Sequence, residues 1–347
     1  MTTGSAVPRC LIASGQRDCW DESGAPIPCS GSGQDGELRP GIPWPDPRFT
    51  TAGELARDRL TGLTWTIDAN LFEWPLTWSE ALDHVAGLRL SHHLGHDDWR
   101  LPTRRELWSL VSFAKRNPAL PEGHPFRGVF LGWYWTSTSA ARNPAYAWAV
   151  QTSGGRVFFE AKDRRAFAWA CRGTSPVLPD TGQSSAFDAA GRPAAAEGSG
   201  QDLGAHSVAW PDPRFEVHDE SVTDRLTGLV WTRSADLSRR VVSWTEALAL
   251  VQALNDGRAS PANWRLPGIT ELESLLDARC CDPSLPAGHP FVHPGAGYWS
   301  STTSSYETDW AMVLHLGRGA IGVGVQRDPR SLVWPVRGPS DSSRAPV

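Results

Sequence analysis

Two arginine–glutamate pairs are the residues of this chain whose types and spacing best suit acid–base or electrophilic chemistry. Arg100 precedes Glu106 by six residues, and Arg265 precedes Glu271 by the same interval. A carboxyl group at such a place could act as a general acid, and a guanidinium could act as an electrophile. Each glutamate also stands at the third position of an expected helix, where a carboxylate caps the first turn. We therefore expect both pairs to be structural.

Two other groups of residues raise the possibility of a metal site. His92, His93 and His96 lie near two aspartates, but the corresponding stretch of the second half of the chain contains no histidine. Asp58 and Asp224 each precede a threonine and a glycine, which favours an Asx turn, whereas calcium needs several converging oxygens. There is no Gly-X-Ser-X-Gly motif, phosphate loop or zinc signature. The sequence therefore predicts a protein without catalytic residues, metal or cofactor.

Composition and charge narrow the class of partner. Residues 1–174 hold 19 Lys+Arg and 18 Asp+Glu, a net charge of +1, and the remainder holds 14 and 20, a net charge of −6. Neither half is a polycation, so nucleic acid is not an expected partner. No apolar run approaches the ~20 residues of a transmembrane segment. Residues 1–14 lack the regions of a signal peptide, so the chain is expected to be cytoplasmic or to begin after a removed leader.

The chain repeats itself along nearly its whole length, with a period of about 165 residues. The repeated stretches include Trp44–Phe49 and Trp210–Phe215, Asp58–Leu63 and Asp224–Leu229, Trp99–Pro102 and Trp264–Pro267, and His124–Phe126 and His289–Phe291. A period of this length predicts whole domains rather than solenoid units. We predict two domains, residues 1–174 with a core of 48–173 and residues 175–347 with a core of 214–338.

The same self-comparison bears on the cysteines. Two cysteine pairs are replaced together in the other copy, each by one residue type: Cys19 and Cys29 by Ala186 and Ala196, and Cys10 and Cys171 by Val177 and Val336. Joint loss is what a disulfide predicts, because a single thiol has no structural partner. We predict the disulfides Cys19–Cys29 and Cys10–Cys171, which favour an oxidising compartment. For Cys280 and Cys281, a vicinal disulfide, two free thiols and an intermolecular bridge all stay open.

Each copy is expected to be α+β, with two helices followed by a late antiparallel β region. The predicted elements of the first copy are a strand at 60–67, helices at 81–88 and 104–113, and strands at 134–139, 146–152, 157–161 and 166–171. Those of the second are a strand at 226–233, helices at 247–254 and 269–276, and strands at 298–303, 310–316, 321–325 and 331–336. Thr77 with Glu80, and Ser243 with Glu246, form the capping-box pattern that begins a helix.

The 18 tryptophans imply cores or platforms built around indoles. Twelve of them match between the copies and are expected in the core: Trp65, Trp78, Trp99, Trp135, Trp148 and Trp169, with Trp231, Trp244, Trp264, Trp299, Trp310 and Trp334. Tryptophans without such a match are better candidates for stacking on sugars, among them Trp20, Trp74, Trp108 and Trp133.

These motifs together resemble the C-terminal domain family of the Legionella collagen-like protein, in two tandem copies. The resemblance is carried by Asp-X-X-Thr-Gly-Leu-X-Trp, Thr/Ser-Trp-X-Glu-Ala-Leu, Trp-Arg-Leu-Pro-X-X-X-Glu-Leu, Tyr-Trp-Ser/Thr-Ser-Thr and Trp-X-X-Arg-Gly, in that order twice. The family in turn is similar to C-type-lectin-like domains of the formylglycine-generating-enzyme type. The resemblance implies a lectin-like fold and, from the eponymous adhesin, binding of sulfated polysaccharides through a basic surface. The acidic second copy departs from that pattern.

We accordingly expect a secreted, periplasmic or cell-surface binding protein that recognises a glycan or a surface protein. A structural envelope module and a formylglycine-generating-type enzyme are the alternatives. Loops between the late strands differ most between the copies, and variable loops on a rigid scaffold commonly bind ligands. The expected ligand-binding residues are Arg142, Asn143, Tyr146, Lys162, Arg164 and Arg165 in the first copy, and Tyr306, Glu307, Asp309, Arg327 and Arg330 in the second. Divergence without function is the competing explanation of these loops.

Overall fold

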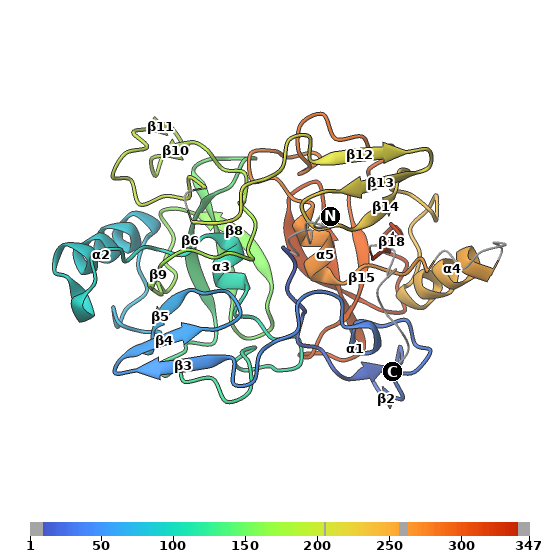
Figure 1. Cartoon of the computed structure of the whole chain (residues 1–347), viewed down its shortest axis with the longest axis horizontal. Helices are drawn as coiled ribbons and strands as arrows, with labels where there is room; N and C mark the ends of the chain where they lie inside the picture. Colours follow the sequence, from blue (N-terminus) through green and yellow to red (C-terminus); the bar gives the residue numbers. More distant parts are fainter. Residues whose placement is uncertain (1–9, 205, 257–262, 339–347) are drawn as a thin grey trace, which may run out of the picture.

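The computed structural model describes residues 10–204, 206–256 and 263–338, and its elements are labelled in Figure 1. The first copy contains β3 (Phe49–Ala52), β4 (Leu55–Asp58), β5 (Thr64–Thr66), α2 (Trp78–Leu90), η1 (His93–Gly95), α3 (Arg104–Trp108), β6 (Trp133–Ser139), β7 (Tyr146–Gln151), β8 (Val157–Ala161) and β9 (Cys171–Arg172). The second contains β12 (Phe215–His218), β13 (Ser221–Asp224), β14 (Val230–Thr232), α4 (Trp244–Asp256), α5 (Ile269–Ser274), β15 (Tyr298–Thr303), β16 (Trp310–His315), β17 (Ala320–Val325) and β18 (Val336–Arg337). The chain is therefore α+β, as expected.

Short elements precede each copy. They are β1 (Cys19–Trp20), β2 (Pro26–Ile27) and α1 (Asp35–Leu38) before the first copy, and β10 (Ala186–Phe187) and β11 (Pro193–Ala194) before the second. We call residues 10–44 leading segment 1 and residues 177–210 leading segment 2, because each leads into its own copy.

Local sequence determines where α2 begins. The hydroxyl of Thr77 accepts a hydrogen bond from the Glu80 N–H, and the Glu80 carboxylate accepts one from the Thr77 N–H, which completes the predicted capping box. The helix buries Trp78, Ala81 and Val85 against the sheet, at helical spacing. The Trp78 indole donates to the Thr136 carbonyl over 2.7 Å, so the helix is also fixed by a polar contact.

Helix α3 is shorter than the sequence suggests. It begins at the predicted place, with Thr103 and Glu106 forming the capping box, but ends at Trp108 rather than at residue 113. The Ser109 hydroxyl bonds the Glu106 carbonyl, and the following N–H groups bond carbonyls three residues back, which tightens the backbone into turns. Helix α5 likewise ends at Ser274, two residues before the expected end.

Both copies contribute to one six-stranded antiparallel sheet. Its order is β15-β16-β17-β8-β7-β6, so three strands come from each copy. Equivalent strands of the two copies stand at equal distances from the two edges of the sheet. The copies join where Ile321 of β17 pairs with Val157 of β8. In Figure 1 the green strands of the first copy and the orange strands of the second face one another across the middle of the molecule.

A smaller antiparallel sheet lies at the outer side of each copy. The orders are β3-β4-β5-β9 and β12-β13-β14-β18. The predicted strand at 60–67 is reduced to β5, because Asp58 begins a turn that occupies the residues before it. The predicted strand at 166–171 is mostly isolated bridges, since its residues pair one at a time with Leu76, Tyr134 and Arg100.

The indoles form the core, as predicted from their matching positions. Eleven of the twelve matched tryptophans are buried, whereas Trp310 is half-buried. Trp65 packs on Trp169 with ring centroids 5.5 Å apart, and Trp231 packs on Trp334 at 5.3 Å. One hydrophobic cluster of the described residues contains members of both copies, and two others belong to a single copy each. The copies therefore do not have entirely separate cores.

Each leading segment packs against the copy that it does not precede. In leading segment 1 the Gln16 side chain donates to the Thr303 carbonyl over 2.8 Å and accepts from the Thr303 N–H over 3.0 Å. Asp35 of α1 is fully buried and accepts a hydrogen bond from the Thr302 hydroxyl. Figure 1 shows the blue α1 beside the orange β15 of the second copy.

Leading segment 2 makes the equivalent contacts on the first copy. Asp202 accepts from the Thr138 hydroxyl over 2.7 Å, and the Ser139 N–H donates to the Gln183 side chain over 2.7 Å. Burial raises the pKa of Asp35 and of Asp202 to about 6, against the lowering effect of their hydrogen bonds to hydroxyl groups. The two segments are thus exchanged between the copies.

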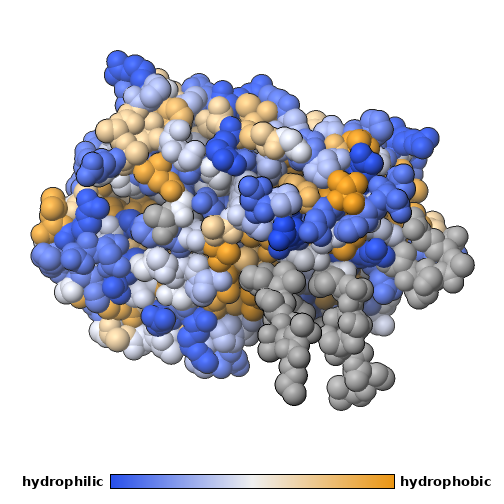
Figure 2. All heavy atoms as spheres, turned by 45° about the horizontal axis from the view of Figure 1, so that its top comes forward, coloured by the Kyte–Doolittle hydropathy of each residue, from blue (hydrophilic) through white to orange (hydrophobic). Residues whose placement is uncertain are grey.

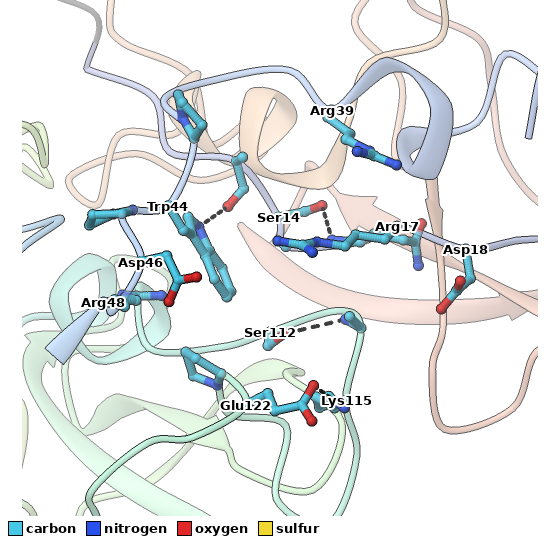
Figure 3. Close-up of a pocket in the computed structure, with 17 residues that line it drawn as sticks. Ser14, Arg17, Asp18, Arg39, Trp44, Asp46, Arg48, Ser112, Lys115 and Glu122 are labelled. Carbon is cyan, nitrogen blue, oxygen red and sulfur yellow. Dashed lines mark hydrogen bonds and ion pairs between the residues drawn. The ribbon is translucent and has the colours of Figure 1, made fainter.

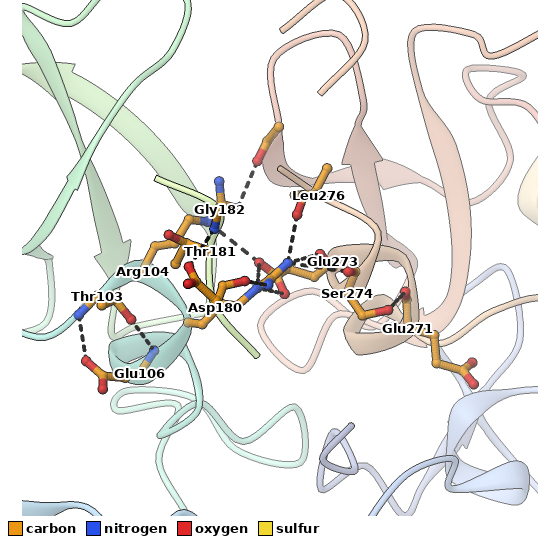
Figure 4. A network of polar contacts seen from close by, with 12 residues as sticks. Thr103, Arg104, Glu106, Asp180, Thr181, Gly182, Glu271, Glu273, Ser274 and Leu276 are labelled. Carbon is orange, nitrogen blue, oxygen red and sulfur yellow. Dashed lines mark hydrogen bonds and ion pairs between the residues drawn. The ribbon is translucent and has the colours of Figure 1, made fainter. Parts of the chain in front are cut away.

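A buried ion cluster joins the copies between α3 and α5 (Figure 4). The Arg105 guanidinium lies 3.0 Å from the Glu273 carboxylate and donates to the carbonyls of Glu273 and Leu276. Arg104 lies 3.7 Å from the same carboxylate and stacks 4.1 Å above the Trp148 ring. Burial lowers the pKa of Arg104 to about 10. One carboxylate therefore compensates two buried cations.

The disulfide predictions have different outcomes. Cys19 and Cys29 form a disulfide with Cα atoms 5.3 Å apart, as predicted. The predicted Cys10–Cys171 disulfide is wrong, because both are buried free thiols. Leading segment 1 carries Cys10 to a small cavity between the copies, lined also by Glu273, whereas Cys171 lies in β9 with its sulfur 3.3 Å from the Arg100 guanidinium. Cys280 and Cys281 are free thiols as well.

The predicted boundary near residue 175, between two independent domains, stays a prediction. The stretches 48–173 and 214–338 do contain equivalent elements in the same order. The segments around them do not follow the expected assignment, since residues within 1–174 cover the second copy and residues after 175 cover the first.

Candidate ligand-binding cleft

A cleft of about 600 Å³ lies beside Trp44, where leading segment 1 runs past the first copy. Figure 3 shows the Trp44 indole in the wall of the cleft, with Asp46 on one side of it and Arg17 and Asp18 on the other. Lys115 and Glu122 border it from the loop after α3. Ligand sites for small molecules commonly have volumes of ~300–1,000 Å³, so the cleft is large enough to hold one.

Trp44 is held rigidly in the wall of the cleft. Its indole N–H donates to the Ala13 carbonyl over 2.9 Å, and the Arg48 guanidinium stacks 4.6 Å from the ring centroid. Arg48 is itself fixed by two hydrogen bonds to Asp58, at 3.1 and 2.8 Å, and by a third to the Ser109 carbonyl. Its Nη1 atom is buried and has no hydrogen-bond partner among the described residues. The indole is thus a preorganised, half-buried platform.

The border of the cleft carries charges of both signs. Arg17, Asp18, Arg39 and Asp46 are exposed, and Lys115 forms a 2.9 Å ion pair with Glu122. The hydrogen bond from Lys115 lowers the pKa of Glu122, so that carboxyl is ionised at neutral pH. An indole surrounded by donors and acceptors of both charges suits a polar ligand with an apolar face.

The second copy has the same framework but different side chains around it. The Trp210 indole donates to the Asp180 carbonyl over 2.7 Å, and Arg214 stacks at 4.6 Å. Arg279 also lies over this ring, at 5.6 Å, and is paired with Asp277. In the first copy the corresponding residues are Ala114 and Ser112.

Lys162 is the predicted ligand-binding residue that the structure places most differently. Its side chain is buried, 1% exposed, with the ammonium group 3.8 Å from the Trp78 ring centroid. It donates to the Ser139 hydroxyl over 2.9 Å and to the carbonyls of Phe187 and Asp188 over 3.2 and 3.3 Å. Burial lowers the pKa of Lys162 to about 8. It anchors leading segment 2 and does not face solvent.

The other predicted residues of the first copy lie at the surface. Arg142 and Asn143 are exposed, and Tyr146 is half-buried against Phe159. Arg142 forms a 3.2 Å ion pair with Asp282 of the second copy. Arg164 and Arg165 are exposed, and Arg165 lies 3.6 Å from Glu80.

In the second copy Tyr306, Glu307, Arg327 and Arg330 are exposed and Asp309 is half-buried. The Tyr306 carbonyl accepts from Arg116 of the first copy over 2.8 Å, and Arg330 pairs with Asp328 at 3.0 Å. The loops at 140–146 and 304–309 therefore contact the opposite copy. None of the eleven predicted residues lines the Trp44 cleft. Whether they bind a ligand stays a prediction.

The candidate catalytic pairs have the expected structural setting. The Arg100 guanidinium makes two 2.6 Å bonds to Glu106, whose carboxylate also caps Thr103. Arg265 and Glu271 form the equivalent pair. These carboxylates cap helices inside the core, and neither lines the Trp44 cleft.

The candidate metal residues are likewise not gathered into a site. Asp58 accepts bonds from Arg48, Thr61 and the Leu60 N–H, which use both of its oxygens. Across residues 10–204, 206–256 and 263–338, no group of three or more His, Cys, Asp or Glu could hold a metal ion.

The sequence does not single out Trp44, because it recurs as Trp210 and so resembles a core residue. Of the tryptophans proposed for sugar stacking, Trp74 is 72% exposed, Trp20 and Trp133 are half-buried, and Trp108 is buried with its N–H bonded to the Gly155 carbonyl. One signal in the sequence could have identified Trp44. The two copies share this tryptophan but differ in nearby residues, since Ser112 and Ala114 of the first copy correspond to Asp277 and Arg279 of the second.

The surface shows no large apolar face in the view of Figure 2, where hydrophobic residues form scattered small groups among hydrophilic ones. Within the described part of the chain, no helix is both long and apolar enough to span a membrane.

Comparison with known proteins places these features in a family. The family model of the Lcl C-terminal domain matches residues 54–172 and again residues 220–337. No curated protein matches the chain. The family and the Cys19–Cys29 disulfide fit an extracellular or surface protein. The two matches together cover more than half of the sequence, and the chain belongs to the Lcl C-terminal domain family, with two copies in tandem.

Proposed function

We propose that this chain is a non-catalytic, extracytoplasmic or cell-surface binding protein that recognises a neutral or zwitterionic glycan in the Trp44 cleft. The observation that carries the proposal is the fixed indole in a cleft of about 600 Å³ with charges of both signs at its border. The lectin-like fold that the family resemblance implies is part of the same proposal.

A sugar ring suits this cleft for a physical reason. One face of a pyranose presents C–H groups that pack on an indole, while its hydroxyl groups need donors and acceptors at the edges. Trp44 offers the flat apolar surface, and Arg17, Asp18, Arg39 and Asp46 offer both kinds of polar group around it. Because the platform is already fixed by Ala13 and Arg48, little conformational entropy is lost on binding.

The charge distribution argues against a polysulfated ligand at this site. A polyanion is held by clustered basic groups with unscreened charge. Here two exposed arginines stand beside two exposed aspartates, and Lys115 is already paired with Glu122. The second copy carries a net charge of −6 by sequence, which adds no attraction for polyanions.

The test is a binding screen of the full chain against neutral, zwitterionic and sulfated glycans, followed by calorimetry with the strongest binder. Trp44→Ala is expected to abolish binding, and Trp210→Ala is the matched control because the same framework surrounds both indoles. Asp18→Ala with Asp46→Ala changes only exposed side chains and is expected to weaken binding without lowering the melting temperature.

Equal binding by the native chain and by Trp44→Ala would contradict the proposed site. Preference for heparin over every neutral and zwitterionic glycan, with steep salt dependence, would contradict the proposed ligand class.

A further inference from the structure

We propose that the second copy carries a closed version of the Trp44 cleft, kept shut by its own Asp277–Arg279 ion pair, so that the chain has one open site. This inference rests on the proposed function, because it concerns where the same ligand can and cannot bind. In this proposal the side chains of Asp277 and Arg279 occupy the position beside Trp210 that a ligand would take beside Trp44.

The frameworks of the two clefts are equivalent. Trp44 and Trp210 each donate their indole N–H to a carbonyl of a leading segment, at 2.9 and 2.7 Å. Arg48 and Arg214 each stack 4.6 Å from the ring centroid. The difference between the clefts must therefore come from the side chains around the indoles.

In the second copy an ion pair lies beside the indole. Arg279 donates to Asp277 through Nε at 3.0 Å and through Nη2 at 2.8 Å, and its guanidinium carbon is 5.6 Å from the Trp210 ring centroid. Asp277 is 1% exposed and is wedged against leading segment 2, since a Cβ added at Gly182 would be 2.4 Å from its Oδ1, whereas the Arg279 side chain is half exposed and lies over the outer part of the indole. The hydrogen bond to Asp277 raises the pKa of Arg279, so the guanidinium stays protonated.

In the first copy the corresponding side chains are too short to reach the indole. Ser112 stands where Asp277 does and Ala114 where Arg279 does, and both line the open cleft. The local turn is nonetheless the same: the Ser112 hydroxyl accepts from the Ala114 N–H at 3.4 Å, as the Asp277 carboxylate accepts from the Arg279 N–H at 2.8 Å. Exchanging these residues between the copies therefore keeps the backbone hydrogen bond.

A ligand for the second cleft would have to displace the Arg279 guanidinium from the indole face and leave the buried Asp277 carboxylate with only its bond from the Arg279 N–H. Both steps cost free energy, because a buried charge needs a compensating group. The first cleft imposes no such cost. The two copies have the same framework but only one is free to bind.

The experiment exchanges the residues in both directions in the full chain. Asp277→Ser with Arg279→Ala gives the second copy the residues of the first, and Ser112→Asp with Ala114→Arg does the reverse. Hydroxyl-radical footprinting with mass spectrometry then reports the solvent access of Trp44 and Trp210 separately. Calorimetry with the neutral trisaccharide chitotriose counts the sites per chain, and circular dichroism confirms folding.

In the native chain Trp44 should be oxidised several-fold faster than Trp210. Asp277→Ser/Arg279→Ala should raise the rate at Trp210 toward that of Trp44, and the number of chitotriose sites should rise from one to two. Ser112→Asp/Ala114→Arg should protect Trp44 and abolish binding. Should the reverse variant unfold, Arg279→Ala alone supplies the footprinting result.

The closure is overturned if the oxidation of Trp210 is unchanged in the folded double variant, or if the native chain already binds two chitotriose molecules. A native chain that binds no glycan at all contradicts the proposed function instead, and footprinting still decides whether the ion pair shields Trp210.

Discussion

The replacement Asp202→Asn should make the chain more stable at neutral pH and leave it nearly unchanged in acid. Asp202 belongs to leading segment 2 and is fully buried against the first copy, where it accepts hydrogen bonds from Thr138 at 2.7 Å and from Thr181 at 2.6 Å. Burial raises its pKa from 3.8 to about 6, and the nearby Glu106 and Asp180 carboxylates add to the rise. Ionisation therefore opposes folding.

The sign of the pH dependence follows from this rise. A folded-state pKa above the unfolded one contributes stability that is complete below about pH 4 and is lost as the pH rises through about 6. At about 1.4 kcal/mol per pH unit, a rise from 3.8 to about 6 amounts to about 3 kcal/mol lost by pH 7. Asparagine keeps an acceptor for one hydroxyl and carries no charge, so the variant does not lose this stability as the pH rises.

The assay is urea unfolding of the native chain and the variant at pH 4.5 and pH 7.5, followed by circular dichroism. The half-buried His124 and His289, whose pKa values are lowered by partial burial, affect both proteins alike and cancel in the difference. Asp202→Asn should gain about 2–3 kcal/mol at pH 7.5 relative to its effect at pH 4.5. An equal destabilisation at both pH values would show that Asp202 is ionised in the folded state and refute the reasoning.

Three further replacements test how the copies are held together, each by urea unfolding. Replacing Cys19 and Cys29 by alanine, as in the second copy, should cost about 3 kcal/mol, because the loop of ten residues they close regains its entropy in the unfolded state; an unchanged midpoint would contradict this. Lys162→Gln introduces the residue type of Gln326 in the second copy. It should lower the free energy of unfolding by about 1–2 kcal/mol, because the bonds to the carbonyls of Phe187 and Asp188 are lost, and it should accelerate proteolysis near residue 188. Glu273→Gln should cost about 3–5 kcal/mol, since Arg104 and Arg105 would stay buried without an anion; a neutral effect would show that the cluster is hydrated.

Much of the fold could be predicted from local sequence. The capping boxes at Thr77 and Thr103 determine where two helices begin, and the recurrence of indoles identifies the core. The ends of α3 and α5 are not predictable in the same way, because a serine hydroxyl and tight turns, rather than a helix-breaking residue, end them.

The exchange of the leading segments could not be predicted from the repeat. Gly33-Gln34-Asp35 recurs as Gly200-Gln201-Asp202, so each segment carries the groups that fit either copy. Which copy a segment covers depends on the path of the chain in space, and self-comparison does not report it. The wrong Cys10–Cys171 pairing has this origin, since it requires the first segment to close on its own copy.

The candidate site could not be predicted from the sequence for a related reason. A tryptophan present in both copies resembles a core residue, and Lys162 resembles a surface residue because it follows a strand beside Asp163 and Arg164. The informative pattern lies in the neighbours of the shared indole, which differ in length and charge between the copies. Recognising it requires knowing which side chains converge on Trp44.

A crystal structure of the chain with its strongest-binding glycan tests the proposed site most directly. We expect one glycan per chain, with a sugar ring packed on the Trp44 indole, polar contacts to Arg17, Asp18, Arg39 or Asp46, and the Asp277–Arg279 pair intact at Trp210. A glycan bound away from Trp44, at the loops of residues 140–146 or 304–309 for example, would contradict the proposal.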